Sequence, residues 1–230
     1  MPSEPSVTVK SVTPSTFAAY PDPIQSNHFK GFNQQKSRAY VEAYLFVADP
    51  NIVICHVTLQ NADLGISSNV IRPPDLLLVS KGNYQLWIAN FHAIWGKRVG
   101  ERVSELNAVL DYATSNLITK LPSLIHSSCN GIGWPVTKVV LAGDFNLSVE
   151  QINKQIQNRP GWAVFQEEDS TLNLQGMLSS SYDHFVALNI DPTVVNVELM
   201  LACDHKILKP NCSSYRTNTS DHIGVLLTIK

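Results

Sequence analysis

A strand-like apolar run leads into a polar loop at residues 136–146, which read Val-Thr-Lys-Val-Val-Leu-Ala-Gly-Asp-Phe-Asn. Two valines and a leucine follow one another without a polar break, which is typical of a strand that is buried on both faces. Gly143 then interrupts the run, and Asp144 and Asn146 place a carboxylate and an amide just beyond it. The stretch therefore predicts a central strand of a layered α/β domain, with polar chemistry at its carboxyl end.

Strand and helix patterns alternate on both sides of this stretch. Strands are predicted at Tyr40–Val47, Ile52–Leu59, Leu76–Val79, Leu86–Phe91, Val136–Ala142, His184–Ile190 and Ile223–Ile229. Helices are predicted at about Glu101–Lys120 and Val149–Gln157. The first two strands form a hairpin around Asp49-Pro50-Asn51. Residues 1–35, rich in proline and serine, are expected to be a poorly ordered or atypical arm, and residues 36–230 the folded domain.

Length and composition limit the class of protein. The chain has 230 residues, of which 44% are hydrophobic and 16% charged, so it has the material for one globular core. A net charge of −2 excludes a protein that binds nucleic acid by overall charge, but it allows a local basic rim. Such a rim is expected from Lys36, Arg38, Lys97, Arg98 and Arg102. No apolar run is long enough to span a membrane, no signal peptide is evident, and the compartment is not indicated.

Ionisable residues gather at the ends of the predicted strands. His92 follows one strand, Asp144 and Asn146 follow the next, and Asp183, Asp221 and His222 precede the last two. If the late strands run antiparallel to the earlier ones, all of these positions meet at one edge. Carboxylates are oxygen ligands for divalent cations, and histidines exchange protons near neutral pH. Hydrolysis of a phosphodiester needs both functions, so we expect a site of this kind.

Four short motifs carry a resemblance to a known family. They are Asn90-Phe91-His92-Ala93, Gly143-Asp144-Phe145-Asn146, Ser181-Tyr182-Asp183-His184 and Ser220-Asp221-His222. With Glu42–Val47 and Arg72-Pro73-Pro74 in the same order, the chain resembles the endonuclease/exonuclease/phosphatase superfamily. It is most similar to the deoxyribonuclease I-like nucleases, with some likeness to the catalytic subunit of cytolethal distending toxins. The resemblance covers about residues 36–230.

The resemblance implies an α/β fold of four layers, an α/β/β/α sandwich in which two mixed sheets pack face to face. It also implies a divalent cation at the edge of the sheets, usually magnesium, with calcium or manganese as alternatives. The implied substrate is nucleic acid, double-stranded DNA in the nuclease branch.

The resemblance assigns acid–base roles to matching positions. His222 matches the histidine that activates the attacking water, and Asp183 matches the carboxylate that orients this histidine. His92 matches the histidine that protonates the leaving oxygen, with Glu42 as its partner. The chain therefore contains two histidine–carboxylate pairs, as the chemistry requires.

Other positions match residues that contact the metal or the substrate. Asp144 and Asp221 match carboxylates beside the metal, and Asn146 matches an amide that hydrogen-bonds phosphoryl oxygens. Tyr40 and Arg72 match positions that contact the sugar-phosphate backbone. The alternative for these two is structural: a half-buried strand aromatic and a surface arginine.

The start of the chain departs from the family's pattern. The family begins with a strand that ends in a catalytic asparagine, and a later Gln-Glu motif supplies the main carboxylate ligand. Residues 1–35 contain neither. We therefore expect the N-terminal strands of the fold to be missing or replaced, which would expose sheet edges and favour a partner chain or self-association.

Three functions stay open. The first is a magnesium-dependent phosphodiesterase, a DNA endonuclease that uses histidine-activated water. The second is a phosphatase of the same superfamily acting on a phosphorylated lipid or inositol, although residues 181–185 lack the Trp-Cys-Asp-Arg run of inositol phosphatases. The third is a weakened or inactive homologue, which the absent Gln-Glu motif favours.

Overall fold

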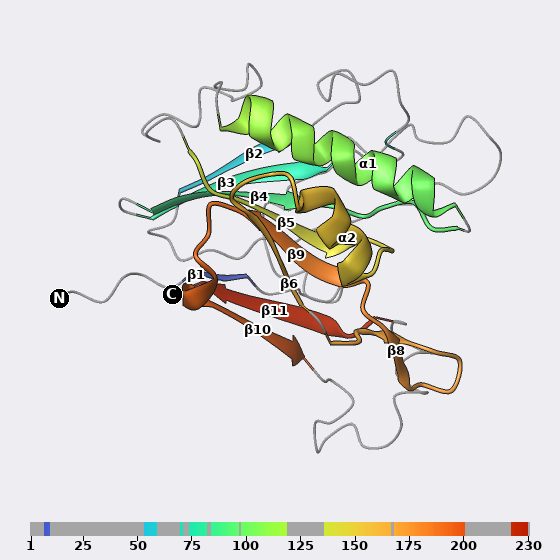
Figure 1. The fold of residues 1–230 in the computed structure, drawn as a ribbon. Coiled ribbons are helices and arrows are strands. Elements are labelled where there is room, and N and C mark those ends of the chain that lie inside the picture. Colours follow the sequence, from blue (N-terminus) through green and yellow to red (C-terminus); the bar gives the residue numbers. More distant parts are fainter. Residues whose placement is uncertain are drawn as a thin grey trace.

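The structure is a computed structural model that describes residues 7–9, 53–58, 70, 74–81, 84–96, 98–118, 136–166, 168–200 and 222–229. These residues form three sheets, of which the two larger ones lie one above the other, with helices on the outer face of the largest sheet (Figure 1). Three of the four expected layers are therefore present among the described residues, and the fold is an α/β sandwich. The predicted strand at 40–47 and the domain boundary at residue 35 lie outside them.

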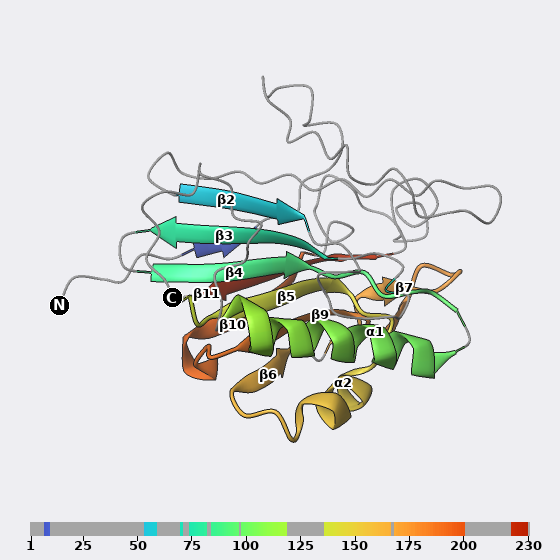
Figure 2. The ribbon, with the colours of Figure 1, turned by 90° about the horizontal axis from the view of Figure 1, so that it is seen from above.

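The larger sheet has six strands in the order β2-β3-β4-β5-β9-β6. Their bounds are β2 Val53–Thr58, β3 Asp75–Lys81, β4 Tyr84–Asn90, β5 Val139–Asp144, β9 Asp183–Leu188 and β6 Trp162–Phe165. The pair β4 and β5 is parallel, and every other neighbouring pair is antiparallel. Seen from above, β2, β3, β4 and β5 lie side by side (Figure 2).

Both faces of this sheet are buried, which explains its unbroken apolar runs. In β3, Leu76 and Leu78 belong to the core on one face, whereas Leu77 and Val79 belong to the core on the other. In β5, Val139 and Leu141 share the first core and Val140 the second. Successive side chains of a strand point to opposite faces, so a strand covered on both sides needs apolar residues at every position.

Two helices cover one face of the larger sheet. Helix α1, Val99–Tyr112, continues as a π-helical segment, Ala113–Leu117, and connects the parallel strands β4 and β5. Helix α2, Val149–Ile156, begins with a capping box in which Ser148 and Gln151 exchange hydrogen bonds. None of the described helices has the length and apolar character that crossing a membrane requires.

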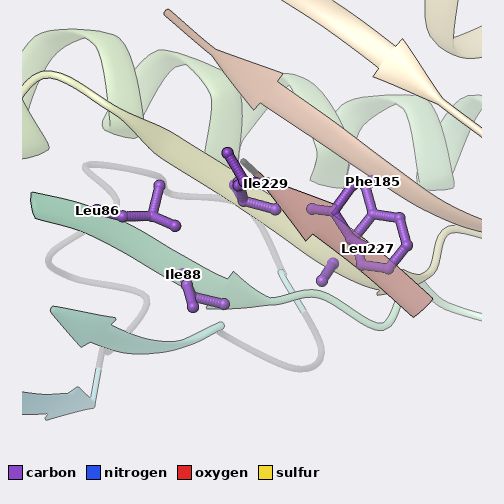
Figure 3. A pocket seen from close by; sticks show the side chains of 7 residues that line it. Leu86, Ile88, Phe185, Leu227 and Ile229 are labelled. Atoms are coloured by element: carbon purple, nitrogen blue, oxygen red, sulfur yellow. The ribbon is translucent and has the colours of Figure 1, made fainter. Parts of the chain in front are cut away.

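The second sheet packs against the other face. It has the order β1-β11-β10, with β1 Val7–Val9, β11 Gly224–Ile229 and β10 Val195–Met200. Leu227 and Ile229 of β11 line an apolar pocket between the sheets, opposite Leu86, Ile88 and Phe185 of the larger sheet (Figure 3). A separate two-stranded hairpin, β7 Thr171–Leu172 and β8 Leu178–Ser180, lies at the end of the molecule where β4 is followed by its loop (Figures 1 and 2).

The structure confirms the predicted strands within the described residues, together with both helices, and adjusts their bounds. Helix α1 begins two residues before the predicted Glu101, and β5 continues through Asp144 instead of ending at Ala142. The short strands β6, β7, β8 and β10 were not predicted. Strand β1 lies within the range expected to form an arm, where it pairs with β11 from Val7 to Val9.

Candidate active site

The candidate site lies where β4 and β5 end and β9 begins. Because β4 is parallel to β5 and β9 is antiparallel to it, the carboxyl ends of two strands meet the amino end of the third. The register places Asp144 of β5 directly opposite Asp183 of β9. From the sequence, the site positions were expected to meet at one edge if both late strands ran antiparallel to the earlier ones. The structure confirms this direction for β9, whereas β11 lies in the other sheet.

A glycine allows the loop after β4 to come close to β5. Gly143 has φ of +141°, and a Cβ atom there would lie 2.2 Å from the carbonyl oxygen of Phe91. On either side of this contact, Phe91 N–H donates to Ala142 O, and Ala93 N–H donates to Asp144 O, both at 2.9 Å. The loop thus continues the pairing of the two strands, and it carries His92 to Asp144.

Asn146 holds the Asp144 carboxylate in place. Its backbone N–H donates to Asp144 Oδ1 at 2.8 Å, and its Nδ2 donates to Asp144 Oδ2 at 3.0 Å and to Ala93 O at 3.3 Å. Asn146 adopts a left-handed conformation, φ +49°, which asparagine tolerates better than most residues. Its side chain is buried and bound to these groups, and its expected hydrogen bond to a phosphoryl oxygen stays a prediction.

Side chains of helix α1 hydrogen-bond to both loops of the site, the loop after β4 and the loop after β5. Glu105, a buried residue of α1, accepts a hydrogen bond from Ile94 N–H through Oε2 at 2.8 Å, two residues after His92. Arg102, one turn earlier, donates from Nη1 to Asn146 O at 2.6 Å. Arg102 was expected in a basic rim for phosphate, and in this structure its guanidinium binds the backbone of the loop.

His222 lies two residues before β11 of the second sheet and pairs with Asp183 of the larger sheet. His222 Nδ1 lies 2.9 Å from Asp183 Oδ2, and the same oxygen accepts a hydrogen bond from Ser170 Oγ at 2.6 Å. His222 also forms a bridge with Thr171 at the start of the β7–β8 hairpin. This arrangement is a histidine–carboxylate pair supported by a hydroxyl.

The two histidines converge on one oxygen atom. His222 Nε2 lies 3.6 Å from Asp144 Oδ2, and His92 Nε2 lies 3.7 Å from the same atom. Both imidazoles are about one third exposed, 30% and 34%, whereas the Asp144 side chain is 15% exposed. Both imidazoles are therefore partly accessible to solvent, while the carboxylate between them is largely covered.

The pKa of Asp144 is raised above its ordinary value of 3.8. Burial is the largest cause, since it removes the charged carboxylate from water, and the negative charge of Asp183 adds to it. His222, the N–H of Asn146 and His92 act in the opposite direction and favour the ionised form. The surroundings of Asp144 therefore disfavour the ionised form of its carboxyl group on balance.

The donor set fits a divalent cation. Ligand atoms of Asp144, Asp183 and His222 all lie within 4.8 Å of one another. A cation beside Asp144 would offset the burial and the repulsion that raise its pKa. Magnesium retains several waters and needs few protein carboxylates, so a small set of ligands suits it.

The structure brings together five of the residues predicted for the site, namely His92, Asp144, Asn146, Asp183 and His222. The other four, Tyr40, Glu42, Arg72 and Asp221, lie outside the described residues. Sequence reasoning missed Ser170, Glu105 and the loop contact of Arg102. It also missed His184, which is buried and lies between two carbonyl oxygens, Leu147 O at 2.8 Å from Nε2 and Gln166 O at 3.2 Å from Nδ1.

No protein-family model matches the chain, and no curated protein matches it in sequence. Solved structures do match. One of them, an endonuclease/exonuclease/phosphatase family protein from Leptotrichia buccalis, is 12% identical, with a TM-score of 0.43, over 78% of this chain and 60% of that chain.

Two further solved structures are similar to the chain. Humanized TDP2 of D. rerio, which carries 14 mutations, is 15% identical with a TM-score of 0.48, over 78% of this chain and 68% of that chain. Cytolethal distending toxin from Actinobacillus actinomycetemcomitans is 14% identical with a TM-score of 0.41, over 80% and 59%. The chain thus spans less than two thirds of the toxin chain, and the likeness concerns the fold alone.

Proposed function

We propose that this protein is a magnesium-dependent phosphodiesterase, and specifically an endonuclease that hydrolyses the backbone of double-stranded DNA. One observation carries the proposal: Nε2 of His92 and Nε2 of His222 converge on Asp144, while Nδ1 of His222 is bound to Asp183. The reaction needs one group that accepts a proton, one that donates a proton, and carboxylates for a cation between them. This edge of the sheet offers all three.

His222 acts as the base. Asp183 Oδ2 accepts the Nδ1 proton of His222, so Nε2 carries the lone pair that accepts a proton from water. The water oxygen then bonds to phosphorus as the bond between phosphorus and the leaving oxygen breaks. His92, whose Nε2 lies 3.7 Å from Asp144 Oδ2, donates a proton to that oxygen.

Asp144, with Asp221 from outside the described residues, would hold the cation. When bound, magnesium supplies positive charge to the phosphoryl oxygens as negative charge builds up on them. Asn146 fixes the orientation of Asp144 and, on binding of substrate, is proposed to donate to a phosphoryl oxygen. Tyr40 and Arg72 are proposed to contact the sugar-phosphate backbone, and Glu42 to orient His92.

The proposal is tested by nicking of supercoiled plasmid. We expect nicking that requires magnesium, stops with chelator, and falls by at least about 10³-fold in His222→Ala, since removal of a catalytic base typically has effects of this size. Glu150→Gln, at an exposed position in α2, is the matched control and should keep the wild-type rate. Single-stranded DNA, RNA and an inositol phosphate, tested in parallel, identify the substrate class.

An inactive homologue is the second candidate, because residues 1–35 contain no Gln-Glu motif of the kind that the resemblance implies. It predicts that a folded sample binds duplex DNA without cutting it at any magnesium concentration. Release of inorganic phosphate from an inositol phosphate, with plasmid left intact, would instead identify a phosphatase and overturn the endonuclease.

A further inference from the structure

Ser170 is enclosed between three segments of the chain. It is completely buried, with 0% of its surface exposed. Its backbone N–H donates to Ser180 O of β8 at 2.9 Å, and its carbonyl oxygen accepts from Ile223 N–H at 2.7 Å. The residue therefore joins the β7–β8 hairpin to the segment that carries His222.

The hydroxyl of Ser170 both donates a hydrogen bond to Asp183 and accepts one from it. Ser170 Oγ donates to Asp183 Oδ2 at 2.6 Å and accepts from Asp183 N–H at 3.3 Å. A serine hydroxyl has one proton, and here that proton is used on the oxygen that also contacts His222 Nδ1. The two bonds together fix the position of Oγ and, through it, the rotation of the Asp183 carboxylate.

We propose that Ser170 is a positioning residue that selects the reactive form of His222, an inference that rests on the proposed function. By directing Oδ2 of Asp183 at Nδ1, Ser170 places the imidazole proton on Nδ1 and leaves Nε2 as the acceptor that faces Asp144. Ser170 touches no substrate. Its effect reaches the reaction only through Asp183.

Ser181 offers a matched control for the loss of a buried serine hydroxyl. Ser181 Oγ is buried two residues before Asp183, and it has no hydrogen-bond partner among the described residues. Ser170→Ala and Ser181→Ala therefore each remove one buried hydroxyl oxygen. Only the hydroxyl of Ser170 binds the Asp183 carboxylate.

The first readout is kinetic. We expect Ser170→Ala to lower kcat for nicking by about 10-fold or more, with KM changed by less than about 2-fold, since loss of a residue that orients an active group has effects of this order. Ser181→Ala should stay within about 2-fold of wild type, and Ser170→Thr, which keeps a hydroxyl, should recover much of the loss. Thermal unfolding confirms that each variant is folded.

The second readout needs no activity. Two-bond ¹⁵N–¹H spectra of the histidine rings report which nitrogen of His222 carries the proton. Wild type and Ser181→Ala should show the Nδ1–H tautomer, and Ser170→Ala a mixture of both. An unchanged tautomer in folded Ser170→Ala, with kcat like that of Ser181→Ala, would overturn the inference. If wild type cuts no DNA, but the tautomer of His222 differs between wild type and Ser170→Ala, the endonuclease is refuted and the role of Ser170 is supported.

Discussion

Asp144 is subject to interactions that favour its ionised form and to others that disfavour it. The proposed function uses its negative charge to hold a cation, but burial and the neighbouring Asp183 make that charge costly. Two hydrogen bonds from Asn146 and the nearby imidazoles keep the carboxylate in place. The protein therefore maintains an unfavourable charge at the point where a cation would be bound.

The raised pKa of Asp144 predicts how the free energy of unfolding depends on pH. Asp144 binds its proton more tightly in the folded state, because its pKa is raised above 3.8. The stability that protonated Asp144 contributes is thus fully present below pH 3.8 and is lost as the pH rises through the raised pKa. In chelator, the unfolding free energy of wild type minus that of Asp144→Asn should fall as the pH increases above 3.8. Urea unfolding at several pH values measures it, and a difference that is constant or grows with pH would contradict the raised pKa.

At the residue scale, the sequence revealed the polar groups that interrupt apolar runs. Asp144 ends one buried strand and His92 follows another, so position alone identified them. Ser170 could not be found in this way, since it lies in a polar stretch and gains its role from contacts with Asp183 and Ile223. His184 follows Asp183 directly, and the alternation of a strand turns it to the opposite side, into the core.

At the scale of elements, α1 does more than connect two parallel strands. Its Glu105 holds the loop that carries His92, and its Arg102 holds the loop that carries Asn146. Because both side chains come from one stretch of α1, the helix links the two loops. A sequence pattern showed the apolar face of α1, whereas these polar contacts depend on which loops pass over it.

Loss of the arginine contact should loosen the Asn146 loop. Arg102→Met keeps most of the apolar stem but removes the donor to Asn146 O, and we expect it to lower the unfolding free energy by about 1–3 kcal/mol. Arg98→Met makes the same change at an exposed position, where the arginine pairs with Glu101, and should alter stability by less than about 0.5 kcal/mol. Chemical unfolding compares the two, and equal effects would show that the loop contact contributes nothing.

Long elements with a strong pattern were predictable, and short ones were not. Strands β3, β4, β5 and β9 have apolar residues on both faces, and this produced clear signals in the sequence. Strand β6 has four residues and follows a turn at Pro160 and Gly161, which gave it too little length for a pattern. Residues 195–199 alternate apolar and polar, a strand signal that we did not recognise, and they form β10.

At the scale of the whole molecule, the candidate site joins the two sheets. Asp144 and Asp183 belong to the larger sheet, whereas His222 directly precedes β11 of the smaller one. The distance from His222 to Asp183 therefore depends on how the sheets pack. That packing rests on the core around Leu227, Phe185 and Val140.

Weakening this core should destabilise the molecule. Leu227, 2% exposed, lies in β11, and Leu227→Ala should lower the unfolding free energy by at least about 2 kcal/mol. Leu174→Ala makes the same change at a residue that is 78% exposed, and its effect should stay below about 0.5 kcal/mol. Urea unfolding measures both. A loss below about 1 kcal/mol for Leu227→Ala would mean that the sheets are held together elsewhere.

The order in which the site residues occur along the chain bears on the protein's own synthesis. A ribosome delivers His92 first, then Asp144 and Asp183, and only later His222 with β11. Until β11 has emerged and docked, His222 is not beside Asp183, and the base that is proposed for the water is not in position. If the protein cuts DNA as proposed, a nascent chain that ends before β11 has no complete site and should not yet cut.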